Sequence, residues 1–546
     1  MRLFLILYLA RCKGKNMNDG VLAKIRKWII RLAWVPLLFG VAGYHFVGDT
    51  VHGTMGFLEA VYATIALYFM NPDSDISNVY VLAAKFTSFL VVADVMFAVF
   101  EALHNSLKHI VSNRFSDSTA VYTDNQDWAR VITDYWKHSY LGEPERHPEK
   151  LEKAKNHILM FEDDMKNLEI YNRCQKNLSG KDIYVMLNHT DPFLVKKLDN
   201  PHLKYFNIYE MMARKFWKDH DIYDEIIDNV STDNVSNNTV SDMAADGIEI
   251  DGTVFSTVGD DNAANRKKGS YEGTYRIAIT DFGAAGEALF RYGFINNVYS
   301  SKQHIEYHIW GAEEHQKSFL QEINEKAGEI EGCDDIIVHD GDPIDGMDIL
   351  GKMSRIIISK LEDRELLQEL LHRRVEADIY YFSDRSVNLD EIYKKKVISF
   401  GQIRNILTEE YLRQDILSRQ GMLFNYDYKL RSEERNAPAD YENEMREAWA
   451  ELDGFLKGSN LARADHYWIE KKLLDEGKAD IREICIIEHN RWCRYHLINR
   501  WIYGESRDKV KGIHPLLVPF DELSKEEQDK DDIYDPVIKK EIERLI

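Results

Sequence analysis

Cysteine is scarce in this chain. Only five of the 546 residues are cysteines, and no two of them have the close spacing of a zinc-binding or redox pair. The sequence therefore gives no reason to expect a disulfide framework or a structural zinc site, and reduced thiols are the simplest interpretation. Basic residues are also outnumbered: 69 lysines and arginines stand against 91 aspartates and glutamates, so the formal net charge is −22. Because nucleic-acid binding needs a basic surface, we expect no nucleic-acid partner.

The sequence also lacks the short motifs that mark several enzyme classes. It contains no Gly-x-Ser-x-Gly nucleophile turn, no His-Glu-x-x-His zinc motif and no P-loop. No group of residues resembles a site for hydride transfer or hydrolysis. We therefore predict that the chain is not an enzyme, with no catalytic residues and no metal ligands.

Long apolar runs are confined to the first 103 residues. The runs at about 28–48 and 79–103 are long enough as helices to cross a bilayer, since a helix rises about 1.5 Å per residue. The shorter run at about 56–70 is predicted to be a re-entrant helix. Basic residues flank both long runs, so the positive-inside rule places both termini in the cytoplasm. These patterns predict a multi-pass protein of the cytoplasmic membrane, in contact with lipid, with a tail at 1–27 and a pore-like domain at 28–114.

The order of span, short helix and span resembles the two-span potassium channels. Residues 64–69 lack both glycines of the potassium filter, so potassium selectivity is not implied. The resemblance implies that Thr64 and Tyr68 line a pore, together with Asp94 and Glu101 from the second span. Alternatively, Asp94 pairs with a polar group between helices and Glu101 extends to the membrane boundary. One hairpin cannot enclose a pore, so we expect a homo-oligomer, and specifically a tetramer.

Strand and helix patterns alternate after residue 118. Apolar strands are predicted at 120–123, 157–161 and 183–188, with helices between them, which favours a parallel sheet. The residues Asp163-Asp164, Asn167-Leu168-Glu169 and Asp191-Pro192 resemble the RCK domain, also called the TrkA N-terminal domain, a relative of the Rossmann fold. The resemblance implies an RCK-like domain at 115–223. Because no glycine-rich turn follows the first strand, a scaffold role in a gating ring is favoured over dinucleotide binding.

A polar segment at 224–270 is predicted to be a linker or insert, and a second Rossmann-like domain follows at 271–400. Its predicted strands are 275–280, 305–310, 336–339, 355–360 and 378–382. The first strand runs into a glycine turn in which Gly283 and Gly286 match the phosphate-binding pattern, but Asp281 replaces the first glycine. Asp281 would repel phosphate, whereas Glu313 could bind a ribose or cap the next helix. A weak nucleotide site is thus a hypothesis here.

A helical connector at 401–424 leads to the C-terminal part, 425–546. The stretch EHNRWCRYHLINRWIYGESRDKVKGIHPLLVPFDEL, residues 488–523, closely resembles the ryanodine-receptor (RyR) repeat domain. Its aromatic planes and its arginine could form a pocket for a nucleotide-like or other small anionic ligand. Alternatively, its tryptophans, His514 and Pro515 are core packing. The predicted ligand-binding residues are Glu488, Asn490, Trp492, Trp501, Tyr503, Arg507 and His514.

The predicted fold class is an α-helical two-span membrane hairpin, followed by two α/β Rossmann-like domains and a mainly α-helical RyR-type domain. The predicted function is a ligand-gated, channel-like membrane protein that senses a nucleotide-like ligand, with a nucleotide or cyclic nucleotide as the gating ligand. By analogy, such a protein could act in nucleotide-signalled antiphage defence. The alternative is a non-conducting, membrane-anchored nucleotide sensor or scaffold.

Overall fold

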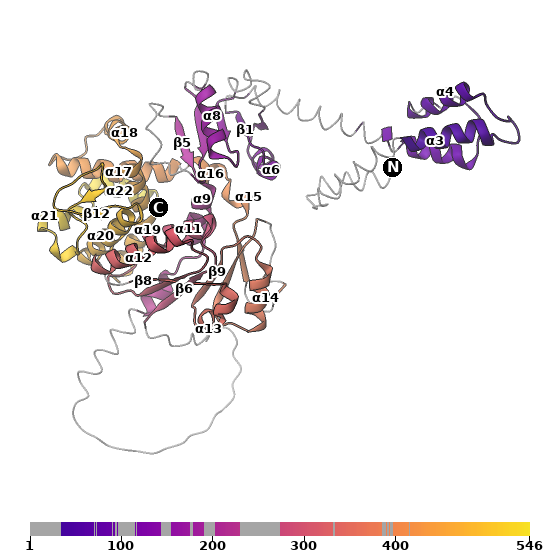
Figure 1. The fold of residues 1–546 in the computed structure, drawn as a ribbon. Coiled ribbons are helices and arrows are strands. Elements are labelled where there is room, and N and C mark those ends of the chain that lie inside the picture. The colour runs from indigo at the N-terminus through magenta and orange to yellow at the C-terminus, as the bar shows by residue number, and fades with distance from the viewer. Residues whose placement is uncertain are drawn as a thin grey trace, which may run out of the picture. The chain divides into compact units, whose positions relative to one another are not determined.

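The computed structural model forms two compact units, residues 1–115 and 116–546, each with its own hydrophobic core (Figure 1). The residues that it describes are 34–69, 74–89, 117–142, 154–174, 180–189, 202–229, 273–330, 334–384, 397–413 and 415–546, with a few single positions between these ranges. The polar segment predicted at 224–270 lies mostly outside them.

The first unit contains short helices. Helix α3 (Val35–Val41) continues into a π-helical turn, η2 (Ala42–Val47), and helix α4 (Phe57–Tyr68) packs against them. Gly40 permits this contact, because an added Cβ would lie 2.4 Å from Thr64 Cγ2. Thr64 is fully buried, and its hydroxyl donates to the carbonyl of Ala60. It is therefore a packing residue between two helices of this unit.

The predicted membrane hairpin is not supported. Across the described parts of the chain, every helix falls short of the length or the apolar character that crossing a membrane requires. The helical stretch from Val35 ends at Gly48, where the backbone turns to a positive φ of 58°. Over its described residues this stretch spans about 20 Å, whereas the bilayer core is about 30 Å thick. Part of the second predicted span, including Asp94 and Glu101, lies outside the described residues. The two-span fold and the multi-pass membrane localisation were therefore wrong.

The second unit begins with a five-stranded parallel sheet in the order β2-β1-β3-β4-β5. Helices α6 (Gln126–Tyr135), α8 (Asp164–Cys174) and α9 (Ile208–Asp219) alternate with the strands. This is the strand order of flavodoxin-like folds. The strands are β1 Thr119–Tyr122, β2 Ser139–Leu141, β3 Asn156–Leu159, β4 Asp182–Met186 and β5 Leu203–Phe206.

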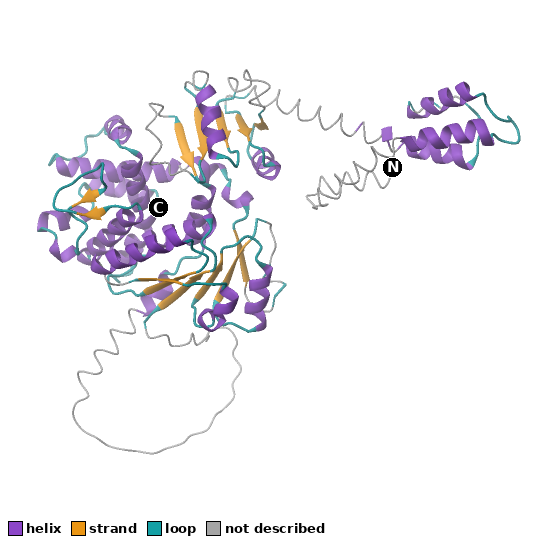
Figure 2. Ribbon diagram, viewed as in Figure 1, coloured by secondary structure: helices purple, strands orange, loops and turns teal. Residues whose placement is uncertain are grey.

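A second parallel sheet has six strands in the order β11-β10-β9-β6-β7-β8 (Figure 2). Read from β8, this is the 3-2-1-4-5-6 order of the Rossmann fold, so the prediction of Rossmann-like sheets is confirmed. Its helices are α11 (Ala284–Asn296), α12 (Glu314–Ile330), α13 (Met347–Leu350) and α14 (Arg364–His372). Its strands are β6 Tyr275–Ile279, β7 Ile305–Ile309, β8 Asp335–Val338, β9 Arg355–Ile358, β10 Asp378–Phe382 and β11 Val397–Phe400.

The C-terminal part is mainly helical, as predicted. Two of its long helices, α19 (Gly454–Asp475) and α20 (Ile481–Ile498), pack on each other and on α11. A two-stranded ribbon, β12 (Ile502–Tyr503) and β13 (Ile513–His514), follows α20. The remaining helices are α15 Ile403–Ile406, α16 Glu409–Arg413, α17 Asp415–Ser432, α18 Glu442–Glu451, α21 Lys525–Gln528 and α22 Pro536–Arg544.

A buried ion pair joins the helical part to the Rossmann-like sheet. Arg494 on α20 lies 2.9 Å from Asp334, just before β8, and both side chains are at most 2% exposed. Arg494 also donates to the carbonyl of Phe294 on α11. Asp334 accepts further hydrogen bonds from the Gln303 side chain and the Ile305 backbone. Every strong polar group of this contact is therefore matched inside the protein.

We expect Asp334→Asn to lower the free energy of unfolding by about 3–5 kcal/mol, because it leaves the Arg494 charge buried without its counter-ion. Urea denaturation followed by tryptophan fluorescence measures this. Asp521→Asn is the control: it removes a pair with Arg482 in which both side chains are more than half exposed, so little change is expected. Equal effects of the two substitutions would contradict the assignment.

Candidate functional site

Helix α20 carries most of the RyR-like residues and is buried on nearly all sides. An aspartate, Asp480, caps its first turn by accepting from the backbone N–H of Glu483. Thirteen of the 18 helix residues are buried, including several that are charged. A helix buried all round is the centre of a domain rather than the wall of an open site.

The predicted residues Glu488 and Asn490 lie in this interior. Glu488 is 2% exposed and accepts two hydrogen bonds from the Arg491 guanidinium, at 2.7 and 2.8 Å. Burial raises the pKa of Glu488, but the charges of Arg491 and Arg463 outweigh this effect and hold it below its usual value. Asn490 is 4% exposed. Neither side chain can meet a ligand from solvent in this conformation.

The predicted residues Trp492, Trp501 and His514 form an aromatic cluster with His496. The rings of Trp492 and His496 lie 3.9 Å apart, and those of Trp492 and His514 lie 4.9 Å apart. Trp501 stacks on Phe455 of α19 at 4.7 Å. These close contacts leave no room for a ligand between the rings, so the core-packing alternative applies to this cluster.

The histidines of the aromatic cluster are held in the neutral form. Burial lowers the pKa of His496 to about 3, while a hydrogen bond to the Trp492 carbonyl opposes this change. Burial and the charge of Arg507 lower the pKa of His514 to about 4. His514 Nδ1 accepts from the Leu516 backbone N–H, so the ring proton is on Nε2.

Two predicted residues, Tyr503 and Arg507, are instead exposed. Tyr503 is 56% exposed at the end of β12, and Arg507 lies in the loop that joins β12 to β13. Asp508 organises this loop: its carboxylate accepts from the backbone N–H groups of Val510 and Lys511, and its backbone pairs with Ile513. Arg507 makes no ion pair with any carboxylate of the described residues. The β12–β13 segment therefore exposes an aromatic ring, that of Tyr503, and a planar cation, that of Arg507.

The glycine turn of the second sheet is closed by its own aspartate. The Asp281 carboxylate accepts from the Gly283 N–H at the start of α11, where a phosphate would bind in a dinucleotide-binding fold. Gly286 is required for packing, because an added Cβ would lie 1.8 Å from the Asp281 carbonyl oxygen. This geometry favours a structural turn over a phosphate site.

The residue Glu313 has a capping role. Its backbone N–H donates to the Gln316 side chain, and its carbonyl accepts from the Lys317 N–H in the first turn of α12. This is a capping-box arrangement. The predicted pore residue Tyr68 ends α4 and is half-buried in the first unit.

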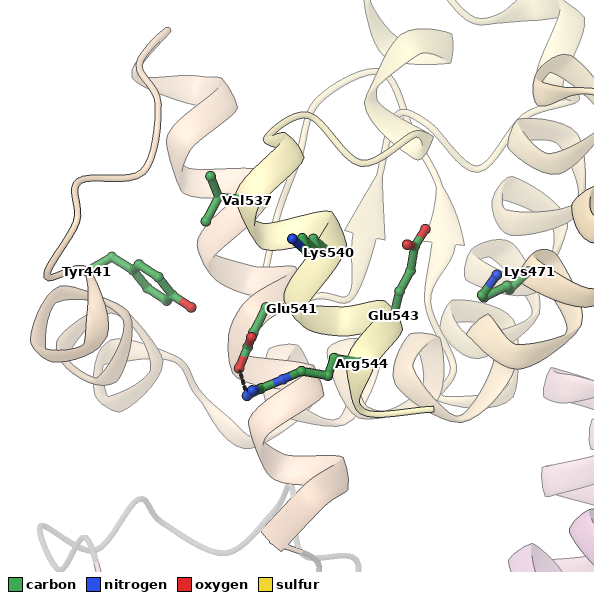
Figure 3. Close-up of a pocket in the computed structure, with 7 residues that line it drawn as sticks. All are labelled: Tyr441, Lys471, Val537, Lys540, Glu541, Glu543 and Arg544. Carbon is green, nitrogen blue, oxygen red and sulfur yellow. Dashed lines mark hydrogen bonds and ion pairs between the residues drawn. The ribbon is translucent and has the colours of Figure 1, made fainter.

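A groove of about 530 Å³, which the sequence did not indicate, lies beside helix α22 (Figure 3). Its lining is mixed in charge: three cationic side chains stand beside two carboxylates. Glu541 is already paired with Arg544 and with Arg419 of α17. The lining residues are Tyr441, Lys471, Val537, Lys540, Glu541, Glu543 and Arg544.

The fold therefore defines a protein with two parallel α/β sheets and a helical C-terminal domain fastened to the second sheet. In a comparison with family models, residues 474–539 match the RyR domain, which covers α20, the β12–β13 ribbon and the start of α22. This match confirms the RyR part of the prediction. The potassium-channel and RCK resemblances receive no support from it. No curated protein matches the chain.

The lowered pKa values of His496 and His514 predict a dependence of stability on pH. The unfolded histidines take up protons near pH 6.5, whereas the folded ones do so only near pH 3–4. Their contribution to stability is thus complete above pH 6.5 and is lost as the pH falls to about 4. Between pH 7 and pH 4, we expect the free energy of unfolding of the His514→Gln variant to fall by about 2–3 kcal/mol less than that of wild type. Urea titrations at each pH measure the difference, and parallel curves for the two proteins would refute it.

Proposed function

We propose that the chain is a ligand sensor whose RyR-type domain binds a small anionic molecule with a planar ring, such as a nucleotide, at the β12–β13 loop. The observation that carries this proposal is the exposure of Tyr503 and Arg507 on that loop, while the other predicted ligand residues of the domain are buried or, for Trp492, partly buried. A tyrosine ring can stack on a base, and a guanidinium fork can bind a phosphate in a bidentate manner.

The loop supports such binding because it is largely pre-formed. Its two ends are joined by the pairing of β12 with β13, and Asp508 fixes its tip. A ligand then loses little free energy to ordering of the loop. Lys509 and Lys511 add positive charge to the same exposed segment. Lys511 lies 3.7 Å from Asp508, a loose contact that a phosphate could replace.

Binding at this loop has a physical route to the α/β part. Trp501 directly precedes β12 and contacts His496 on α20, with ring centres 5.2 Å apart. Two residues before His496, Arg494 forms the buried pair with Asp334 of the second sheet. A ligand with different affinities for two arrangements of the loop would shift this connected structure between them.

The groove beside α22 is the competing place for the same ligand. Its volume lies within the range of small-molecule pockets, and Lys471, Lys540 and Arg544 line it. Its carboxylates, however, reduce its preference for an anion. The predicted tetramer stays a prediction that sedimentation can test.

We expect Arg507→Ala to weaken the binding of a nucleotide at least tenfold, about 1.4 kcal/mol, because it removes the phosphate partner. Calorimetric titration of the full chain with nucleoside mono-, di- and triphosphates and cyclic nucleotides measures this. Arg482→Ala is the matched control, since Arg482 is an exposed arginine at the opposite end of α20.

A second variant, Lys540→Ala, distinguishes binding at the β12–β13 loop from binding in the groove beside α22. Loss of binding in this variant alone would move the site to the groove. If none of the panel binds to wild type, or if Arg507→Ala and Tyr503→Leu both bind as wild type does, the proposed loop site is refuted.

A further inference from the structure

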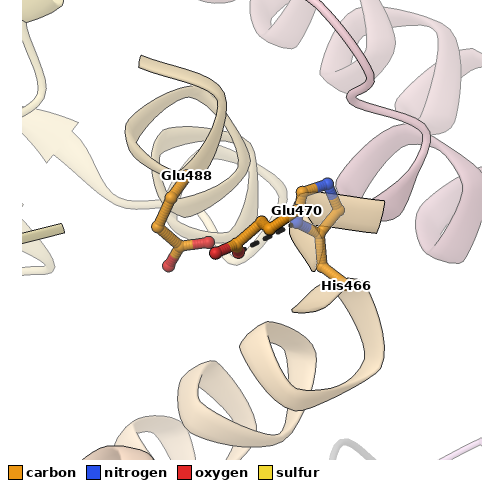
Figure 4. A group of neighbouring side chains, drawn as sticks. All are labelled: His466, Glu470 and Glu488. Atoms are coloured by element: carbon orange, nitrogen blue, oxygen red, sulfur yellow. Dashed lines mark hydrogen bonds and ion pairs between the residues drawn. The ribbon is translucent and has the colours of Figure 1, made fainter. Parts of the chain in front are cut away.

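Three side chains with metal-binding atoms meet inside the helical domain, away from the exposed loop. They are His466 and Glu470 on α19 and Glu488 on α20 (Figure 4). One nitrogen and two carboxylate oxygens lie within 4.8 Å of one another, and the residues are 0%, 2% and 2% exposed. His466 and Glu470 are four residues apart, so they lie on the same helix face.

The histidine ring is oriented with a nitrogen lone pair toward the carboxylates. His466 Nε2 donates to the carbonyl of Val298, in the loop after α11, at 2.8 Å. Since a neutral imidazole carries one proton, Nδ1 is then an acceptor, and it faces Glu470 Oε1 at 3.3 Å. Two hydrogen-bond acceptors repel each other at this distance, so the contact is unfavourable unless a cation or a proton lies between Nδ1 and Oε1. A carbonyl bound to the outer ring nitrogen is the arrangement that orients metal-bound histidines.

Of the two carboxylates in this cluster, Glu470 has the fewer cationic contacts. Among the described side chains, its ion-pair partner is His466 alone, across the 3.3 Å contact. The nearby guanidinium groups make their direct contacts with Glu488: Arg491 binds both of its oxygens, and Arg463 Nε lies 3.6 Å from Oε1. The charge of Arg463 also acts on Glu470, but without a direct ion pair. A buried carboxylate that makes no direct contact with a lysine or arginine is costly.

We propose that His466, Glu470 and Glu488 bind one divalent transition-metal ion, with Zn²⁺ or Mn²⁺ as the chemistry that fits. An imidazole nitrogen with two carboxylate oxygens suits these ions better than Ca²⁺ or Mg²⁺, which prefer oxygen ligands alone. Binding at about 2.1 Å would draw the three ligand atoms closer together than they are now. The role of the ion is structural: it would join α19 to α20 and, through His466, to the Val298 loop of the second sheet.

The metal content of the purified full chain tests this site. The protein is expressed in medium supplemented with Zn²⁺ and Mn²⁺, dialysed exhaustively and measured by plasma mass spectrometry. We expect about one ion per chain in wild type and less than a tenth of that in Glu470→Gln, which keeps the side-chain shape but loses the charge. Treatment with a chelator should lower the melting temperature of wild type and leave that of Glu470→Gln unchanged.

The control is Asp465→Asn, next to His466 on α19. It breaks a partly buried pair with Arg214 and should destabilise the fold without removing the ion. Equal metal loss in this variant would show that the loss follows from unfolding and would overturn the proposal. A wild-type chain without metal, and with no rise in melting temperature on adding Zn²⁺ or Mn²⁺, would also overturn it and would leave a shared proton between His466 and Glu470.

Discussion

The pair between Arg494 and Asp334 is the interaction on which the rest of the second unit depends. Both groups are fully desolvated, so their attraction must be supported by further hydrogen bonds to be stable. Those bonds come from the Phe294 carbonyl, Gln303 and the Ile305 backbone. Because these partners belong to the Rossmann-like sheet and Arg494 to the RyR-type domain, the pair specifies how the two pack. The helical domain is thus built around a contact with the α/β part.

Two further arginines, Arg355 and Arg214, also join parts of the second unit. Arg355, at the start of β9, donates to the carbonyls of His220 and Asp221 and lies over the rings of Trp217 and Tyr380. It thereby fixes the end of α9, a helix that follows the first sheet, against the second. Arg214 on α9 pairs with Asp465 of α19, in the helical C-terminal part. Buried arginines therefore connect all three parts of the second unit.

Much of this fold could be predicted from the sequence. The central strands of both sheets were found because they are continuous apolar runs, and the glycine turn before α11 was read correctly. The strands of these two sheets that were missed, β2, β5 and β11, are all edge strands. An edge strand has a neighbour on one side only and is less buried, so its pattern is weaker. Within the RyR-type domain, spacing showed which residues share a helix but not that α20 is buried on both faces. Glu488 was therefore assigned to a ligand pocket, whereas it pairs with Arg491 in the interior, and the pair His466 and Glu470 was overlooked.

Native-state hydrogen exchange of the full chain tests the central claim, that the RyR-type domain and the second α/β sheet form one cooperative structure. The account predicts that the amides of α11 and α20 open with the same free energy, and that a bound nucleotide protects the β12–β13 loop together with the loop containing Val298. If α20 exchanges independently of α11, and protection stays within the β12–β13 loop, the account is contradicted.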